Sequence, residues 1–215
     1  MNLEQARFNM VEQQIRPWDV LDPQILELFM TTPRHEFVTE AQQALAYSDI
    51  ELPIGENQTM LPPRVEARLL QALDPSFNES ALEIGTGSGY TTAILAKAVK
   101  HVTTVEIHPS LQSQAKERLK SFNNITFQQG DASQDWQDAQ SYDVILITGA
   151  VTETPQAYKN KLNLGGRLAV IHGQKPVMTA EVYTRISESE WESETLFETC
   201  IPYLVHAEPK DTFAF

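Results

Sequence analysis

Residues 82–90 of this 215-residue chain read Leu82-Glu83-Ile84-Gly85-Thr86-Gly87-Ser88-Gly89-Tyr90. The apolar run from Ala81 to Ile84 predicts a short strand, and residues 91–100 predict a helix after it. Glycine in a strand-to-helix turn lets the backbone bend sharply and lets a ligand approach without a Cβ atom in the way. The helix N-terminus that follows offers free N–H groups and a partial positive charge to an anion. This stretch therefore predicts a ligand-binding turn.

The spacing of the glycines favours one kind of ligand. A dinucleotide site has the pattern G-x-G-x-x-G, but the sixth residue counted from Gly85 is Tyr90. The spacing here is G-x-G-x-G with the acidic Glu83 two residues upstream, a form usual for S-adenosylmethionine. Glu106 ends the next predicted strand, 21 residues after Gly85, where its carboxylate can accept hydrogen bonds from both hydroxyls of a ribose. We expect S-adenosylmethionine as the cofactor.

A third predicted strand, residues 125–129, is followed by Gly130-Asp131-Ala132. The Asp131 carboxylate can accept a hydrogen bond from an adenine at this edge of the sheet. The candidate cofactor-binding residues are Glu83, Gly85, Thr86, Gly87, Ser88, Gly89, Glu106, Ile107, Asp131 and Ala132.

Strands and helices alternate through the middle of the chain. Further strands are expected at residues 142–148 and 167–171, with a short helix between them at 156–162. Alternation of this kind predicts an α/β fold with a doubly wound, mostly parallel sheet that helices cover on both faces. The last forty or so residues predict two antiparallel strands, 182–186 and 196–204, that close one edge of the sheet and are separated by an acidic run at 188–194.

The first 78 residues predict a helical N-terminal lobe. Asp22 followed by Pro23 is a favourable helix start, because aspartate caps the N-terminus and proline fits the first helical position. Residues 47–63 show no clear period and predict a long loop, of a kind that is often functional in compact domains. We expect one domain, divided into the helical lobe and substrate loop (1–78), the cofactor-binding core (79–175) and the C-terminal strands (176–215).

Composition excludes several classes of protein. The formal net charge of −13, without a concentrated basic patch, disfavours nucleic acid as a partner. No apolar run approaches the ~20 residues needed to span a bilayer, so no membrane association is expected. Cys200 is the single cysteine, which indicates a reducing compartment and a cytoplasmic protein. No ligand spacing typical of a metal site occurs, and none is expected.

Motifs spread over nearly the whole chain carry a resemblance to one family. Besides residues 82–90, they are Met10-Val11-Glu12-Gln13-Gln14-Ile15-Arg16, Pro33-Arg34-His35-Glu36-Phe37-Val38, Ala46-Tyr47-Ser48-Asp49, Leu52-Pro53-Ile54-Gly55, Gln58-Thr59, Val105-Glu106-Ile107 and Gly165-Gly166-Arg167-Leu168. In these motifs the chain resembles the protein-L-isoaspartate O-methyltransferase family. The resemblance implies a Rossmann-like class I methyltransferase that methylates the free α-carboxylate of isoaspartyl residues in damaged proteins. The methyl ester then collapses to a succinimide, and its hydrolysis restores some normal aspartyl linkages.

The chain departs from the family pattern in the substrate loop. The family usually follows Gln-Thr with an aliphatic residue and a serine placed close to the reacting carboxylate, whereas Leu61 occupies the serine position here. The preceding Gly-His-Gly is altered to Gly55-Glu56-Asn57. Thr59 can supply a hydroxyl in place of the missing serine, or it can cap the loop. The resemblance thus assigns Thr59 and the chemically inert Leu61 to the catalytic site.

Three functions remain open on the sequence. The first is methylation of isoaspartyl proteins or peptides, favoured by the full-length resemblance. The second is a methyltransferase with another acceptor, such as a small molecule, favoured by Leu61 and the altered glycines. The third is a non-catalytic protein that binds S-adenosylmethionine. Arg64 is either a partner for a substrate carboxylate or an exposed charge at a helix start.

Overall fold

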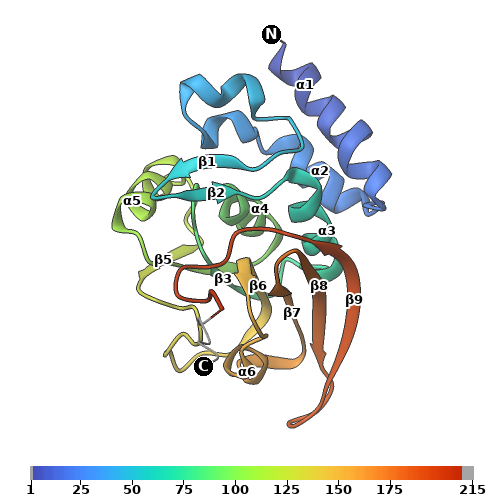
Figure 1. The fold of residues 1–215 in the computed structure, drawn as a ribbon, viewed down its shortest axis with the longest axis vertical. Coiled ribbons are helices and arrows are strands. Elements are labelled where there is room, and N and C mark those ends of the chain that lie inside the picture. The colour runs from blue at the N-terminus through green and yellow to red at the C-terminus, as the bar shows by residue number, and fades with distance from the viewer. Residues whose placement is uncertain (1, 210–215) are drawn as a thin grey trace, which may run out of the picture.

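The computed structural model describes residues 2–209, and its centre is a seven-stranded sheet (Figure 1). The strands are β3 (Ser80–Ile84), β4 (His101–Glu106), β5 (Ile125–Gln129), β6 (Tyr142–Val151), β7 (Leu162–Gln174), β8 (Val177–Arg185) and β9 (Trp191–Thr199). Their spatial order is β5-β4-β3-β6-β7-β8-β9. All pairs from β5 to β7 are parallel, whereas β8 pairs antiparallel with both β7 and β9. The predicted α/β fold, with a mostly parallel sheet and antiparallel C-terminal strands, is confirmed.

Helices cover both faces of the sheet because its central strands are apolar on both sides. In β6, Val144 and Leu146 pack into a large cluster with α3 (Pro63–Leu73) and α4 (Tyr90–Ala98). The alternate residues Ile145 and Ile147 pack into a second cluster, which includes Tyr158 of α6 (Gln156–Asn160). Side chains that alternate between two buried faces are typical of parallel sheets. The fourth helix of the core, α5 (Pro109–Arg118), packs beside β4 and β5.

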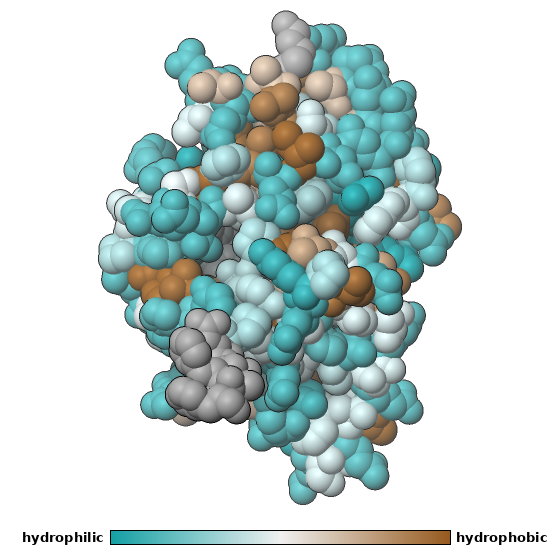
Figure 2. Space-filling view, viewed as in Figure 1, coloured by the Kyte–Doolittle hydropathy of each residue, from teal (hydrophilic) through white to brown (hydrophobic). Residues whose placement is uncertain are grey.

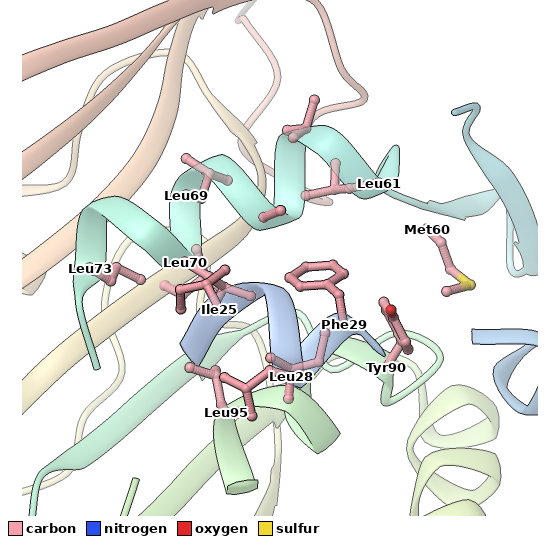
Figure 3. Packing of buried hydrophobic residues seen from close by; sticks show 14 of the residues in the cluster. Ile25, Leu28, Phe29, Met60, Leu61, Leu69, Leu70, Leu73, Tyr90 and Leu95 are labelled. Atoms are coloured by element: carbon pink, nitrogen blue, oxygen red, sulfur yellow. The ribbon is translucent and has the colours of Figure 1, made fainter. Parts of the chain in front are cut away.

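The N-terminal lobe is helical, as predicted. It consists of α1 (Leu3–Met10), a π-helical turn (Val11–Ile15), a 3-10 turn (Arg16–Trp18), α2 (Pro23–Thr31) and two further 3-10 turns (Arg34–Phe37 and Glu40–Leu45). Asp22 caps α2 by accepting hydrogen bonds from the N–H groups of Gln24 and Ile25. Figure 3 shows apolar side chains of α2 between those of α3 and Leu95 of α4, which fixes the lobe to the core.

The segment 47–63 is not the irregular loop that the sequence predicted. It contains an antiparallel hairpin of β1 (Leu52–Gly55) and β2 (Gln58–Met60). Its two central turn residues, Glu56 and Asn57, both have positive φ, at 51° and 57°. A two-residue turn of this kind usually carries Asn-Gly or Asp-Gly. Because glutamate rarely adopts positive φ, the usual sequence signal for the hairpin was missing.

The prediction for the C-terminal strands was correct in topology and wrong in extent. The second strand begins at Trp191, inside the acidic run, and ends at Thr199 rather than at Leu204. Its glutamates occupy alternate, exposed positions along this edge strand of the sheet. The acidic run is therefore compatible with a strand. Residues 200–207, here termed the C-terminal segment, leave the sheet and cross back to β6 (Figure 1), where Tyr203 pairs with Ala150.

Figure 2 shows hydrophilic residues over most of one face, with hydrophobic residues gathered toward the top, over the N-terminal elements. Within residues 2–209, no helix has the length and apolar character needed to cross a membrane.

Candidate functional site

A central pocket opens at the carboxyl ends of the parallel strands. Its walls include the turn after β3, Glu106 at the end of β4, Asp131 after β5 and Thr148 in β6. The strand order reverses at this place. From β3 the chain continues to β4 and β5 on one side of the sheet, whereas the next strand, β6, lies on the other side of β3. Ligands of open parallel sheets bind at such a switch point.

The glycine turn after β3 has a backbone that only glycine can adopt without strain at its first position. Gly85 has a φ of 94°, and a Cβ atom there would lie 2.4 Å from Thr148 Oγ1. The single proton of the Thr148 hydroxyl is shared between the carbonyl oxygens of Gly85, at 2.7 Å, and Ile84, at 2.9 Å, so the position of this hydroxyl is fixed. Gly87 also has positive φ and lies against Ile54 of β1. The turn therefore presents bare backbone to the pocket.

Glu106 lies between the glycine turn and the start of α5. Its Oε2 accepts a hydrogen bond from the Gly87 N–H at 2.8 Å, and its Oε1 accepts one from the His108 N–H at 2.9 Å. The residue is 4% exposed and lines the pocket. Each carboxylate oxygen can accept a second hydrogen bond, so both oxygens are oriented toward a ligand without losing their protein partners.

Asp131 lies at the rim of the pocket, where the C-terminal segment reaches it. Its Oδ1 accepts the Ser133 N–H at 2.9 Å, and its Oδ2 lies 2.7 Å from His206 Nδ1. Burial acts to raise the pKa of Asp131, but hydrogen bonds from His206 and Ser133 outweigh it and the pKa is lowered. Leu204, two residues earlier, packs against Gly149 and closes one side of the pocket. The sequence pattern predicted a strand as far as residue 204, so this segment was not expected at the pocket.

Glu83 does not line the pocket, although it was predicted as a cofactor-binding residue. It is fully buried beneath α4, where its Oε2 accepts hydrogen bonds from the hydroxyls of Thr92 and Thr104 at 2.5 and 2.6 Å. Thr104 in turn lies 2.6 Å from the hydroxyl of Thr86, which does line the pocket. Burial raises the pKa of Glu83 to about 8. Its contact with the pocket is therefore indirect, through two threonines.

The hairpin and the start of α3 form the opposite wall. Thr59 of β2 and Leu61 line the pocket, and Leu61 is 5% exposed. Thr59 Oγ1 donates to Glu51 Oε2 at 3.4 Å, a long hydrogen bond that holds the hairpin base weakly. The Leu61 side chain lies at the N-terminal end of α3, close to Phe29 and Tyr90 (Figure 3). This wall is mainly apolar at the position where the resemblance places a serine.

A buried ion pair lies directly behind this wall. Arg34 Nη1 donates to Glu66 Oε2 at 2.5 Å, and Arg34 Nη2 donates to the Leu61 carbonyl oxygen at 2.5 Å. The second oxygen of Glu66 accepts the Thr91 hydroxyl at 2.9 Å. Arg34 is 0% and Glu66 is 3% exposed. Burial raises the pKa of Glu66, and the Arg34 charge and both hydrogen bonds oppose that rise. Sequence analysis did not single out Glu66, which lines the pocket.

Arg64, considered from the sequence as a partner for a substrate carboxylate, and His35, of the motif at 33–38, are not among the residues that line the pocket. Arg64 pairs with Asp49 at 2.9 Å, and its guanidinium lies 4.4 Å from the ring centroid of Trp18. His35 Nδ1 lies 2.6 Å from the Tyr47 hydroxyl. The geometry thus favours a structural role for Arg64 on the hairpin side of the lobe.

Most of the predicted cofactor residues come together in one place. Those that line the pocket are Gly85, Thr86, Gly87, Ser88, Glu106, Ile107, Asp131 and Ala132, joined by Thr59 and Leu61 from the predicted catalytic pair. Gly89 packs instead against Ala115 and Leu119 after the turn. Within residues 2–209, no cluster of His, Cys, Asp and Glu has the geometry of a metal site.

Comparison with known sequences assigns the chain to a family. A family model described as Protein-L-isoaspartate(D-aspartate) O-methyltransferase matches residues 5–205. The chain belongs to this family. A protein-L-isoaspartate O-methyltransferase from Magnetococcus marinus is 39% identical over 181 residues, which are 83% of this chain and 79% of the relative. Another from Picosynechococcus sp. is 41% identical over 166 residues, which are 76% of this chain and 75% of the relative. The family and the methyltransferase class predicted from the sequence are confirmed.

Solved structures share the fold of this chain. A protein-L-isoaspartate O-methyltransferase has a TM-score of 0.80 and 25% identity, and the match covers 92% of this chain and 65% of that one. A protein from Plasmodium falciparum, solved in complex with S-adenosyl-L-homocysteine, has a TM-score of 0.80 and 18% identity, covering 95% of this chain and 98% of the other. Both share the fold that the sequence predicted.

Proposed function

We propose that the protein transfers a methyl group from S-adenosylmethionine to the free carboxylate of isoaspartyl residues in proteins or peptides. One observation carries the proposal: the glycine turn and Glu106 line the same pocket as the hairpin residues Thr59 and Leu61. A cofactor site on the sheet and an acceptor site under the N-terminal lobe are thereby continuous. Membership of the protein-L-isoaspartate O-methyltransferase family supports this choice of acceptor.

The residues present fit S-adenosylmethionine. Glu106 keeps one accepting position free on each oxygen, which suits the two hydroxyls of a ribose. Asp131 is held ionised by its lowered pKa, so its carboxylate can accept from the amino group of an adenine. Gly85 and Gly87 provide backbone without a Cβ atom beside the methionine portion. A site with these features needs no pyrophosphate anchor.

The protein's part in the reaction is alignment and exclusion of water. S-adenosylmethionine supplies a methyl group that its sulfonium has already activated. A carboxylate acceptor is ionised at neutral pH, so the chain needs no general base. Residues of the hairpin and of the C-terminal segment both line the pocket, which limits access of water to the acceptor. Orientation of two reactants can contribute ~7–11 kcal/mol to lowering a barrier.

A second candidate is methylation of a different acceptor, such as a small molecule. It is favoured by Leu61, whose apolar side chain lines the pocket where the family pattern has a hydrogen-bonding serine. The narrower proposal of a cytoplasmic protein rests on the single Cys200, which indicates a reducing compartment.

Transfer of labelled methyl groups to a pair of synthetic peptides tests the proposal. The peptides have the same sequence and differ only in an isoaspartyl or an aspartyl linkage. We expect base-labile label in the isoaspartyl peptide and none in its partner. Label in neither peptide, with S-adenosylhomocysteine still bound in calorimetry, would exclude the isoaspartyl acceptor and favour the second candidate.

A further inference from the structure

The buried pair Arg34–Glu66 gives the acceptor end of the pocket an unusual electrostatic arrangement. Glu66 and Leu61 form part of the pocket wall, and Arg34 donates to both of them from behind. The guanidinium is therefore one side chain removed from any acceptor bound there. Of the described residues that line the pocket, none is Lys or Arg. Arg34 is thus a fixed cation directly behind the wall that Leu61 and Glu66 form.

The positive charge of Arg34 is balanced by the carboxylate of Glu66 beside it. Burial raises the pKa of Glu66, but the Arg34 guanidinium and the hydrogen bonds from Thr91 and Arg34 oppose that rise and favour the carboxylate form. The ring of Tyr90 covers Arg34 at 4.8 Å to its centroid. Arginine remains charged in proteins, so without Glu66 a buried cation would face the pocket unbalanced. Such a cation attracts an anionic acceptor strongly in a water-poor site.

Strong attraction of the acceptor carboxylate would slow methyl transfer. The carboxylate oxygen donates an electron pair to the methyl carbon, the carbon–sulfur bond breaks, and the sulfur keeps that bonding pair. The negative charge of the acceptor is consumed as the ester forms, so a cation beside it stabilises the ground state more than the transition state. Binding energy of this kind lowers KM and kcat together.

We propose that Glu66 balances Arg34 so that the acceptor carboxylate binds without being trapped, which makes Glu66 a charge-balancing, positioning residue for the reaction. This inference rests on the proposed function, because it requires an anionic acceptor. Arg34 also has a structural role in this arrangement. Through the Leu61 carbonyl, Arg34 fixes the backbone of the acceptor wall, and this hydrogen bond persists when Glu66 is replaced by glutamine.

The decisive variant is Glu66→Gln, which keeps the size and an amide oxygen to accept from Arg34, but removes the negative charge. Its amide NH2 then faces Thr91 and donates to the Thr91 hydroxyl, which can accept. We expect both KM and kcat for the isoaspartyl peptide to fall about tenfold, with kcat/KM nearly unchanged. In calorimetry with S-adenosylhomocysteine present, the same peptide should bind about tenfold more tightly. Damage to the fold alone would raise KM or weaken binding, so the direction of change separates the two explanations.

A second charge variant keeps the test available if Glu66→Gln does not fold. Arg34→Gln leaves Glu66 facing the acceptor, so KM should rise about tenfold, and the peptide should bind correspondingly more weakly. The double variant Arg34→Gln with Glu66→Gln removes both charges and should bring KM and the peptide dissociation constant back toward natural values. Glu79→Gln is the matched control, since Glu79 pairs with Arg167 at the same 2.5 Å distance but outside the pocket walls.

The outcomes separate this inference from the proposed function. Opposite shifts of KM in the two single variants, with recovery in the double variant, support charge balancing. Equal or parallel shifts in the single variants, while the natural protein methylates isoaspartyl peptide, overturn charge balancing alone. Failure of the natural protein and all variants to methylate or bind the peptide, with S-adenosylhomocysteine binding intact, overturns the proposed function and this inference with it.

Discussion

Glu106 Oε2 accepts a hydrogen bond from the backbone N–H of Gly87 at 2.8 Å, which ties the end of β4 to the glycine turn after β3. The carboxylate is held on its other side by the His108 N–H. These two contacts orient the carboxylate before any ligand binds. A prepared carboxylate of this kind loses little side-chain freedom on binding, which favours affinity.

Replacement of Glu106 by alanine should therefore weaken cofactor binding. The loss of charge-assisted hydrogen bonds to a ribose corresponds to about 1–3 kcal/mol in the binding free energy of S-adenosylhomocysteine. Calorimetric titration measures it directly. Glu117→Ala, at an exposed position on α5, is the control and should bind normally. An unchanged dissociation constant for Glu106→Ala would remove the ribose role.

A methyl group at Gly85 should abolish cofactor binding. The alanine Cβ would lie 2.4 Å from Thr148 Oγ1, and φ at this position is 94°, so Gly85→Ala carries both a clash and backbone strain. Gly165→Ala separates the two effects, because Gly165 has a φ of 77° with no neighbouring heavy atom within 4 Å of the added Cβ. We expect reduced thermal stability in both variants and loss of S-adenosylhomocysteine binding only in the first. Normal binding by Gly85→Ala would mean that the turn can shift.

The core and the cofactor turn were predictable because local sequence patterns determine them. Apolar strands, the glycine spacing and Glu106 at a strand end each leave a signature within a few residues. The hairpin and the C-terminal segment have no such local signature. The hairpin has Glu56 at positive φ, and the C-terminal segment is positioned by pairing between Tyr203 and the distant Ala150. Tertiary contacts of this kind have no local pattern.

Glu66 did leave a signal in the sequence. It shares a helical stripe with Leu69, Leu70 and Leu73, at spacings of three, four and seven residues, all of which are buried. An acidic residue on the apolar face of a helix requires a buried partner. Its partner, Arg34, lies 32 residues earlier in the sequence, so the pair itself could not be read from spacing.

Substitution of Leu61 by serine should increase activity on isoaspartyl peptide and reduce stability. The new hydroxyl can donate to the acceptor carboxylate, which corresponds to about tenfold in kcat/KM. Removal of a buried leucine side chain costs about 2–5 kcal/mol of unfolding free energy. Leu61→Ala is the matched control, since it opens the same space without a hydroxyl. Equal gains in both variants would attribute the effect to space and exclude the hydrogen bond.

Replacement of Glu83 by glutamine should change how stability depends on pH. Burial raises the pKa of Glu83 from 4.5 to about 8, against the opposing hydrogen bonds from Thr104 and Thr92. The folded state therefore keeps the proton up to about pH 8, whereas the unfolded chain releases it near pH 4.5. Stability associated with this group is present at low pH and is lost as pH rises through this window, by about 1.4 kcal/mol per pH unit.

Glu83→Gln cannot ionise, so its free energy of unfolding should fall less steeply between about pH 5 and 8 than that of the natural protein. Urea unfolding at a series of pH values gives the difference between the two curves, in which the contributions of other titrating groups cancel. Glu117→Gln, an exposed substitution, should leave the natural pH dependence in place. Parallel curves for Glu83→Gln and the natural protein would show that Glu83 is ionised in the folded state. In that case the hydrogen bonds from its two threonine donors outweigh burial. The hydroxyl chain from Thr86 through Thr104 would then end on a negatively charged carboxylate rather than on a neutral carboxyl group.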